Sequence, residues 1–284
     1  MQNHIEQTIE QVTGSRPRRL SSFGGGGIAD VYKVDLENGS AIVAKTSEAG
    51  NSLSLEARML QYLRASTALP VPTVLFDDSR LLLMSLLPTS GSLGETGNVE
   101  AADLIASLHT ITDDYFGFDY DTVIGGLHQP NPRNARWLPF FAEHRLIHMG
   151  QQAMKAGQLP VSMMARLEKF CERLDTWLEE PDHPALIHGD LWGGNVLTDR
   201  GHISGFIDPA LYFADPEIEL AFSTLFNTFS QAFFDRYREH RPIKPGFFEE
   251  RRDIYNIYPL LVHVCLFGGS YVTSVERTLS KFGV

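Results

Sequence analysis

The chain has 284 residues, 43% of them hydrophobic and 21% charged, which is enough for one two-lobed enzyme or two modest domains with a sizeable core. A formal net charge of −11 opposes binding to nucleic acid, because such binding requires Lys and Arg to neutralise phosphates. No signal peptide is expected, because residues 1–6 lack a basic start and an apolar run, and no membrane span is expected, because the longest apolar stretch, residues 258–269, is too short. Cys171 and Cys265 lie far apart and match no metal or redox spacing, which favours a reduced, cytoplasmic setting.

The first part of the chain predicts a short polar helix at residues 4–13, followed by small strands and turns up to about residue 47. One turn contains four consecutive glycines, Gly24, Gly25, Gly26 and Gly27. Glycine backbone N–H groups can approach phosphate oxygens closely, but no Walker-type Lys follows the run and no complete G-x-G-x-x-G is present. The run is therefore as compatible with a flexible hairpin as with a lid over nucleotide phosphates.

A Lys–Glu pair is predicted from the next two elements. Lys45 ends an apolar strand at residues 41–45, where its side chain either extends to solvent or reaches a buried anion. In the helix expected from residue 52 to about residue 65, Leu55, Met59 and Leu63 recur at four-residue steps, and Glu56 lies beside this apolar stripe. A carboxylate there requires a cationic partner, and Lys45 is the natural candidate for a pair that positions nucleotide phosphates. The alternative is two unrelated surface charges.

Two strands, at residues 74–76 and 81–87, precede a break at residues 88–91, which we take as the boundary between an N-terminal lobe, residues 1–87, and a C-terminal lobe, residues 88–284. Backbone groups from Ser85 to Leu87 would be placed to bind an adenine, although the same run also fits a plain buried strand. After the break, helices are expected at residues 99–109, 137–150 and 161–178, with an irregular connection at residues 115–136. His109 fits a cap or core residue better than a ligand.

The segment from Leu186 to Leu197, with Phe206-Ile207-Asp208-Pro209 downstream, carries the strongest chemical signal. Asp190 and Asn195 are five residues apart, as in the kinase pattern H-R-D-x-x-x-x-N, with Gly189 where protein kinases carry Arg. Asp208 ends a third short apolar run. Phosphoryl transfer needs a carboxylate to orient the attacking hydroxyl, which predicts Asp190 for that role, and oxygen ligands for Mg²⁺, which predicts Asn195 and Asp208. The alternative is an Asx-rich turn between strands.

Two further residues near this segment are candidates for supporting roles. Glu219 lies in the apolar part of a helix that starts near Asp215, where it could accept hydrogen bonds from the Asp190 loop or simply be an exposed carboxylate. Trp192, in a polar Gly-Gly loop, could form a flat wall for a sugar or pack the loop onto the C-terminal lobe. Together with Glu219 we place His188 of the same motif among the structural supports.

The motif His188-Gly189-Asp190-Leu191-Trp192-Gly193-Gly194-Asn195, with Ile207-Asp208-Pro209-Ala210, resembles the fructosamine kinase family. The likeness covers most of the chain and includes the Phe116-Gly117-Phe118, Trp137-Leu138-Pro139-Phe140-Phe141 and Phe267-Gly268-Gly269-Ser270-Tyr271 segments. Eukaryotic members often have Cys at the position of Ile28, so redox control through that Cys is not carried over. The resemblance implies an α+β, two-lobed, protein-kinase-like fold, with an N-terminal antiparallel sheet plus one helix and a mostly helical C-terminal lobe.

By the same resemblance, the expected reaction is ATP-dependent, Mg²⁺-assisted phosphorylation of the sugar 3-hydroxyl of a small-molecule or protein-bound ketosamine, leading to deglycation. A kinase of the same fold acting on an aminoglycoside, choline or homoserine is the nearest alternative, and a nucleotide-binding pseudoenzyme is a more distant one. A protein kinase is disfavoured because Asp208 is followed by Pro209-Ala210 rather than Phe-Gly. The sequence does not determine the oligomeric state.

Overall fold

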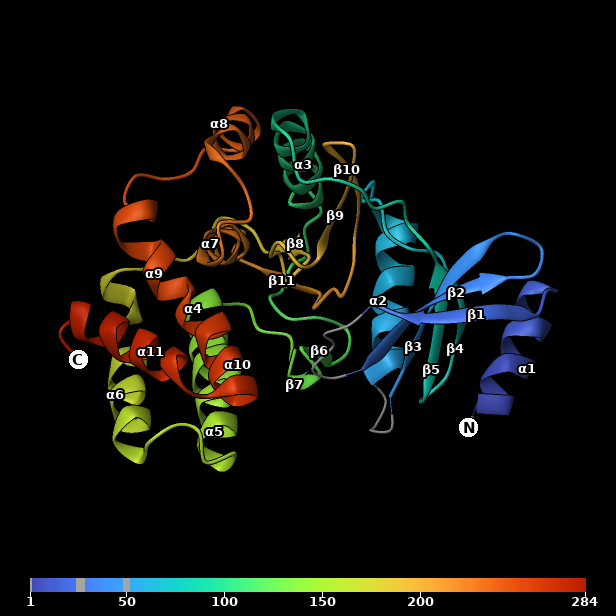
Figure 1. Cartoon of the computed structure of the whole chain (residues 1–284). Helices are drawn as coiled ribbons and strands as arrows, with labels where there is room; N and C mark the ends of the chain where they lie inside the picture. The colour runs from blue at the N-terminus through green and yellow to red at the C-terminus, as the bar shows by residue number, and fades with distance from the viewer. Residues whose placement is uncertain (1, 24–28, 48–51) are drawn as a thin grey trace. The chain divides into compact units, whose positions relative to one another are not determined.

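The computed structural model describes residues 2–23, 29–47 and 52–284, and it divides into two compact units (Figure 1). Unit 1 comprises Met1–Gly97 and Val196–Pro209, and unit 2 comprises Asn98–Asn195 and Ala210–Val284. The boundary expected from the sequence lay after residue 87. Unit 1 instead continues to Gly97 and takes in a segment from the second half of the chain.

Unit 1 is built on a five-stranded antiparallel sheet with the strand order β1-β2-β3-β5-β4. Its strands are β1 (Pro17–Ser22), β2 (Asp30–Leu36), β3 (Ala41–Thr46), β4 (Val74–Asp77) and β5 (Leu81–Ser85), and its helices are α1 (Gln2–Thr13) and α2 (Ser52–Ser66). Alternate residues of β2 and β3, such as Val34 and Ala44, pack with Ile9 of α1 in one buried cluster. In α2 the buried side chains are Leu53, Ala57, Met59, Leu60 and Leu63. Leu55, which the four-residue spacing assigned to this stripe, is only half-buried.

The late segment joins unit 1 through backbone hydrogen bonds. It forms an antiparallel hairpin of β9 (Val196–Asp199) and β10 (His202–Phe206). Phe206 N–H donates to the Pro70 carbonyl at 2.8 Å, and Gly94 N–H donates to the Gly201 carbonyl at 3.1 Å. Because these bonds fix the hairpin to unit 1, Asp208 at its end is positioned by unit 1 as well.

Unit 2 is mostly helical. Its helices include α3 (Glu95–Leu108, which starts in unit 1), α4 (Trp137–Phe141), α5 (His148–Lys155), α6 (Val161–Cys171), α7 (Glu217–Leu225), α8 (Gln231–His240), α9 (Arg252–Tyr255), α10 (Ile257–Phe267) and α11 (Ser270–Lys281). Two short antiparallel pairs accompany them, β6 (Thr122–Ile124) with β7 (Leu127–Gln129), and β8 (Ala185–Ile187) with β11 (Tyr212–Ala214). No helix in the described part of the chain is long and apolar enough to cross a membrane.

The two units confirm the predicted α+β class, with an N-terminal antiparallel sheet and a mostly helical C-terminal part. Three details differ from expectation. The connection at residues 115–136 contains the β6–β7 hairpin, the helix expected at 161–178 ends at Cys171 before a short 3₁₀ turn, Leu174–Thr176, and α4 continues into α5 through a π-helical segment, Ala142–Ile147.

Candidate functional site

In unit 1, Lys45 lies between two carboxylates. The residue is 6% exposed near the end of β3, and its Nζ is 2.7 Å from Glu56 Oε1 on α2. Nζ also donates to Asp208 Oδ1, at the end of the β9–β10 hairpin. The predicted Lys45–Glu56 pair is therefore present, and Asp208 shares its cation.

Burial and neighbouring charges shift the pKa values of Lys45 and Glu56. Burial alone would lower the pKa of Lys45, but the negative charges of Glu56 and Asp208 outweigh it and raise that pKa above its ordinary value. Burial also raises the pKa of Glu56 to about 7, because attraction to Lys45 offsets only part of the lost hydration. The ammonium is thus held charged, and the Glu56 carboxyl group binds a proton more readily than an ordinary glutamate does.

Asp208 differs from Glu56 in exposure and backbone conformation. Its side chain is 42% exposed, against 13% for Glu56. Its φ of 54° is in the left-handed region, which non-glycine residues seldom adopt and which clusters at functional sites. The Asp208 carboxylate therefore remains reachable by a solvent-borne cation while one of its oxygens binds Lys45.

The expected adenine-binding segment follows β5. Ser85 N–H donates to the Thr73 carbonyl at 2.9 Å, and Ser85 Oγ accepts from Thr73 N–H at 2.9 Å. Among the described residues, Leu86 and Leu87 form no backbone–backbone hydrogen bond outside the helices and strands. The glycine run Gly24–Gly27 lies outside the described residues.

In unit 2, the segment after β8 is fixed by a tight backbone contact. Ala210 N–H donates to the His188 carbonyl at 2.8 Å, and the His188 side chain is fully buried. Gly189 has φ +86°, and a Cβ at this position would collide with the Ala210 carbonyl. Glycine replaces the Arg of the protein-kinase pattern here because no side chain fits between these two backbone segments.

The carboxylate of Asp190 is oriented by Asn195. Asn195 Nδ2 donates to Asp190 Oδ2 at 2.8 Å and to the Asp190 carbonyl at 2.9 Å. Because the amide nitrogen makes both contacts, the Asn195 Oδ1 oxygen is left without a hydrogen bond from the described residues. The loop thus presents a half-buried carboxylate next to a free amide oxygen.

A buried chain of polar groups supports this loop from α7. Glu219 is 2% exposed, and its Oε1 accepts from Gly189 N–H at 2.8 Å. Its Oε2 is 2.8 Å from His109 Nε2, and His109 Nδ1 is 2.8 Å from the Tyr237 hydroxyl. Glu219 is therefore not an exposed helix carboxylate. His109 is a core residue, but its contact with Glu219 links α3 to the loop, which the helical spacing of His109 did not indicate.

Trp192 lies on the surface of the same loop. Its side chain is 38% exposed, and its ring meets Phe226 edge-on, with the ring centroids 5.8 Å apart. A Cβ on Gly194 would collide with the Trp192 ring, so the glycine permits the ring to fold over the loop. Trp192 thus packs against Phe226, the residue that follows α7, and remains partly open to solvent.

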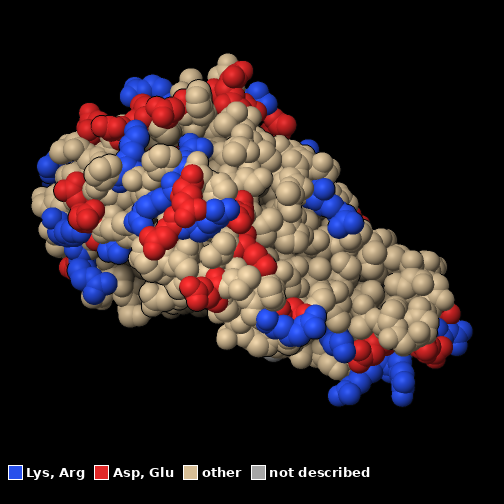
Figure 2. All heavy atoms as spheres, turned by 90° about the horizontal axis from the view of Figure 1, so that it is seen from above, with Lys and Arg blue, Asp and Glu red and all other residues tan. Residues whose placement is uncertain are grey.

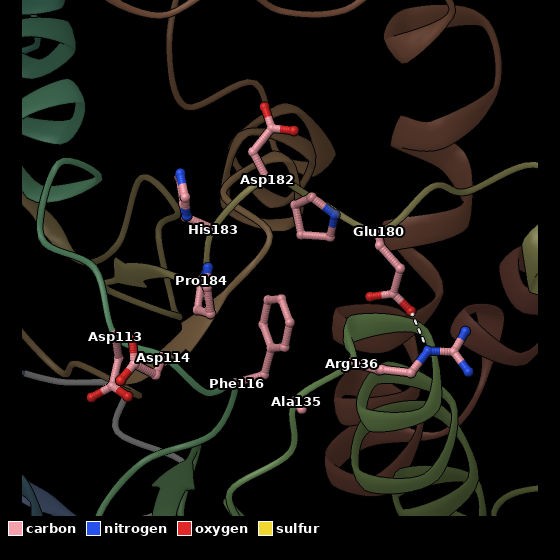
Figure 3. A pocket seen from close by; sticks show the side chains of 10 residues that line it. Asp113, Asp114, Phe116, Ala135, Arg136, Glu180, Asp182, His183 and Pro184 are labelled. Atoms are coloured by element: carbon pink, nitrogen blue, oxygen red, sulfur yellow. Dashed lines mark hydrogen bonds and ion pairs between the residues drawn. The ribbon is translucent and has the colours of Figure 1, made fainter.

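None of these residues lines the two largest-volume cavities described in unit 2. One cavity of about 280 Å³ is lined by Phe116 and by polar side chains, among them the Arg136–Glu180 ion pair at 3.2 Å (Figure 3). The other, of about 620 Å³, is lined by residues that include Trp177, Asp215 and Arg251. The site residues instead form two groups. Lys45, Glu56 and Asp208 meet in unit 1, and His188, Asp190, Asn195 and Glu219 meet in unit 2.

Known proteins resemble the chain along its whole length. A family model described as fructosamine kinase matches residues 1–282. A probable ketoamine kinase of Vibrio parahaemolyticus is 33% identical over 264 residues, which cover 90% of each chain. The ketosamine-3-kinase of Mus musculus is 32% identical over 249 residues, covering 82% of this chain and 74% of the mouse protein.

Solved structures agree with this result. A crystal structure from Thermobifida fusca, of a protein inferred to be a fructosamine-3-kinase, is 29% identical and aligns with a TM-score of 0.85 over 98% of both chains. Macrolide and aminoglycoside phosphotransferases that are 12% to 18% identical align with TM-scores of 0.60 to 0.65 and share the fold alone. The chain belongs to the fructosamine kinase family.

Proposed function

We propose that this protein transfers the γ-phosphoryl group of ATP to the 3-hydroxyl of a ketosamine, a step that leads to deglycation of the amine. Family membership and the names of the Vibrio and mouse relatives support the substrate class. The observation that carries the chemistry is the Asp190 carboxylate, which is oriented by the Asn195 amide at 2.8 Å.

In the proposed reaction, Asp190 orients the attacking hydroxyl and accepts its proton. The hydroxyl oxygen forms a bond to the γ-phosphorus as the bond from that phosphorus to the bridging oxygen breaks, and ADP leaves. Asp190 suits this role because it is half-buried and its Oδ2 has a fixed donor, so its position changes little during proton transfer. Glu219 and His188 act as positioning residues through the backbone of the loop.

Lys45 is proposed to contact the phosphates of ATP, with Glu56 holding its Nζ in place at 2.7 Å. In the structure Asp208 takes up a second contact of the same Nζ. The backbone groups of Leu86 and Leu87, for which no backbone partner is found among the described residues, support an adenine site at the end of β5. If the glycines 24–27 close over the phosphates, they would complete this nucleotide site.

The residues present also fit Mg²⁺, which prefers oxygen ligands and retains water and phosphate oxygens. Asn195 Oδ1 accepts no hydrogen bond from the described residues, and the Asp208 side chain is 42% exposed. These two residues would hold the ion. When bound, it would neutralise charge on the phosphates.

The acceptor sugar is proposed to lie against Trp192, whose 38% exposed ring is the open apolar surface nearest to Asp190 in sequence. Acidic and basic side chains are interspersed on the face shown in Figure 2, so this face offers no purely basic surface for nucleic acid. The proposed partner is a small or protein-bound ketosamine. The cytoplasmic location expected from the sequence stays a prediction.

The test is a coupled assay for ADP release with a panel of acceptors. We expect turnover of fructosamine and ribulosamine adducts, and phosphate on the sugar 3-oxygen by NMR of the product. Turnover of an aminoglycoside, choline or homoserine with none of any ketosamine would contradict the acceptor assignment and leave the kinase chemistry in place. ATP binding with no turnover of any acceptor would indicate a pseudoenzyme.

A further inference from the structure

In unit 2, four aromatic rings follow Trp192 in a series of ring-to-ring contacts. These are Phe226, His263, Phe267 and Tyr271, which we call the aromatic strip. Phe226 follows the end of α7, and its ring centroid is 5.8 Å from that of Trp192 and 5.1 Å from that of His263. His263 in turn is 5.8 Å from Phe267 and 4.9 Å from Tyr271. The rings thus form a continuous path that starts on the Asp190 loop.

The strip is exposed at its two phenylalanines, whereas His263 and Tyr271 are half-buried. Phe226 is 36% exposed and Phe267 is 61% exposed. An exposed aromatic ring contributes less to the stability of the fold than a buried one does. The two phenylalanines are joined through the half-buried ring of His263, and exposed apolar rings that are linked in this way mark a binding surface more often than scattered single residues do. The strip is therefore a candidate for contact with a ligand.

The backbone between α10 and α11 is specialised to bring these rings together. Gly268 has φ 61° and ψ −139°, and Gly269 has φ 61° and ψ −131°. Residues with a Cβ are excluded from this combination of angles. Because the chain reverses at these two glycines, Tyr271 at the start of α11 packs against His263 of α10. His263 and Phe267 are four residues apart and share one face of α10.

His263 gives the strip one polar atom of defined character. Its Nδ1 is 2.7 Å from the Pro259 carbonyl, and because a carbonyl can only accept, Nδ1 carries the proton. Burial lowers the pKa of His263, which favours the neutral ring. Nε2 therefore has a lone pair, and no described residue donates to it. The strip thus combines apolar ring faces with one hydrogen-bond acceptor, a set that suits an apolar stem bearing an N–H group.

The connectivity of a ketosamine indicates which part of it would reach the strip. The 3-oxygen that receives the phosphoryl group is on C3, and the amine is attached at C1, two carbons away, so the amine and everything bonded to it extend away from the reacting hydroxyl. With the sugar on Trp192, the next surface along the ring path is Phe226. Ring faces also attract ammonium groups, which a protonated secondary amine provides.

We propose that the aromatic strip binds the amine carrier of the ketosamine, with the carrier's methylene stem on Phe226, Phe267 and Tyr271 and an N–H group donating to His263 Nε2. This inference rests on the proposed function and adds to it the part of the substrate that sets selectivity. A lysine side chain, with four methylenes and a backbone N–H at its far end, has the required chemistry.

The experiment measures kcat/KM for three fructose adducts, those of methylamine, hexylamine and the ε-amine of lysine. The adducts of hexylamine and lysine should be preferred by the parent protein. Phe267→Ser and Phe226→Ala should each lower kcat/KM for these two by about 3- to 10-fold, the size expected for one ring contact. The methylamine adduct and the KM for ATP should change less than twofold.

His263→Phe separates the polar contact from the apolar one, because it keeps a ring and removes Nε2. It should lower kcat/KM for the lysine adduct about 3- to 10-fold and leave that for the hexylamine adduct nearly unchanged. Val161→Ala is the matched control, since Val161 is 74% exposed on α6 and outside the strip. Thermal melting of every variant identifies any loss of folding.

Equal losses for all three adducts would show that the rings only support the fold and would overturn the inference. A change in molecular mass of Phe267→Ser on gel filtration would identify the strip as an interface between copies and would also overturn it. Both outcomes leave the proposed function intact, because the parent still phosphorylates the methylamine adduct. If the parent turns over none of the three adducts, the proposed function and the inference both fail.

Discussion

Lys45 shows how one buried cation depends on its partners. Removing one partner of a buried ion pair costs several kcal/mol, typically about 3–5, because the other charge is left uncompensated. Here Lys45 has two partners, Glu56 and Asp208, one of which is far more exposed than the other. Loss of either carboxylate would therefore leave the ammonium paired, whereas loss of Lys45 would place two carboxylates together without a cation.

Lys45→Met tests the proposed nucleotide contact. We expect kcat/KM for ATP to fall by about 10²-fold or more, the effect of losing an electrostatic contact to the transferred group. Binding of the sugar amine, measured by calorimetry without nucleotide, should change little. Equal losses for both substrates would instead indicate a general folding defect, which circular dichroism would detect.

Asp190→Asn tests the proposed proton acceptor. The amide keeps the size of the carboxylate but cannot accept the hydroxyl proton, so kcat should fall by about 10²- to 10⁴-fold, as for loss of a general base. Affinity for ATP, followed by fluorescence of a nucleotide analogue, should be retained. A variant with full turnover would remove Asp190 from this role.

Trp192→Ala tests whether the acceptor sugar binds against the Trp192 ring. Since the ring is 38% exposed, its removal should destabilise the protein little, while the KM for the sugar amine rises about 10-fold and that for ATP is unchanged. A fall in thermal stability with no change in KM would assign Trp192 to packing against Phe226 instead.

One carboxylate on an apolar helix face predicted the Lys45–Glu56 ion pair, which is present in the structure. The roles of Asp190 and Asn195, inferred from a kinase-like spacing, stay predictions. The contact between His109 and Glu219, 110 positions apart, could not be predicted in this way, since helical periodicity reports only that a residue is buried. The left-handed backbone of Asp208 had no sequence signal either.

At the level of elements, the loop after β8 is held from two sides. Ala210 N–H donates to the His188 carbonyl, and Gly189 N–H donates to the Glu219 carboxylate on α7. Both contacts are to backbone atoms, so the position of Asp190 depends on how closely Gly189 approaches its neighbours.

Gly189→Ala should disrupt this arrangement, because its Cβ would collide with the Ala210 carbonyl and the residue would retain an unfavourable φ of +86°. We expect kcat to fall at least 10-fold and the protein to lose about 1–3 kcal/mol of stability in urea unfolding. Gly193→Ala is the matched control, since nothing lies within 4 Å of a Cβ there. Similar behaviour of both variants would show that the close approach at Gly189 does not control the loop.

The elements that the sequence did not predict are those whose geometry depends on distant contacts. The β6–β7 hairpin has strands of three residues, too short for an alternating pattern, and buried bonds stabilise it, among them Gln129 Nε2 to the Ala210 carbonyl at 3.1 Å. The π-helical turn between α4 and α5 contains Arg145, which is fully buried over the ring of Tyr212. Local periodicity cannot report either contact.

At the scale of the whole molecule, neither unit is continuous in sequence. The β9–β10 hairpin belongs to unit 1 although it follows the Asp190 loop of unit 2 within a few residues. A boundary read from one break, such as that at residues 88–91, cannot detect this return of the chain. The residues proposed for the chemistry are consequently divided between the units, with Lys45, Glu56 and Asp208 in unit 1 and Asp190 and Asn195 in unit 2.

Each unit also contains a buried carboxylate whose protonation affects stability. Burial raises the pKa of Glu56 in unit 1 to about 7, from an ordinary value of 4.5. In unit 2, burial and then the charge of Glu217 raise the pKa of Asp215 to about 6, from 3.8, although Asp215 accepts hydrogen bonds from the Tyr255 hydroxyl and Glu217 N–H. In both cases the folded state binds the proton more tightly than the unfolded state.

The sign of the pH dependence follows from this difference. Each contribution to stability is fully present below the ordinary pKa and is lost as the pH rises through the folded-state value, from 4.5 to about 7 for Glu56 and from 3.8 to about 6 for Asp215. The ligand-free protein should therefore melt a few degrees higher at pH 5 than at pH 8. Glu56→Gln and Asp215→Asn should each reduce this difference, because neither replacement titrates, whereas Glu172→Gln, at an exposed carboxylate, should retain it. An unchanged pH dependence in both buried variants would show that these carboxylates bind their protons no more tightly in the folded state.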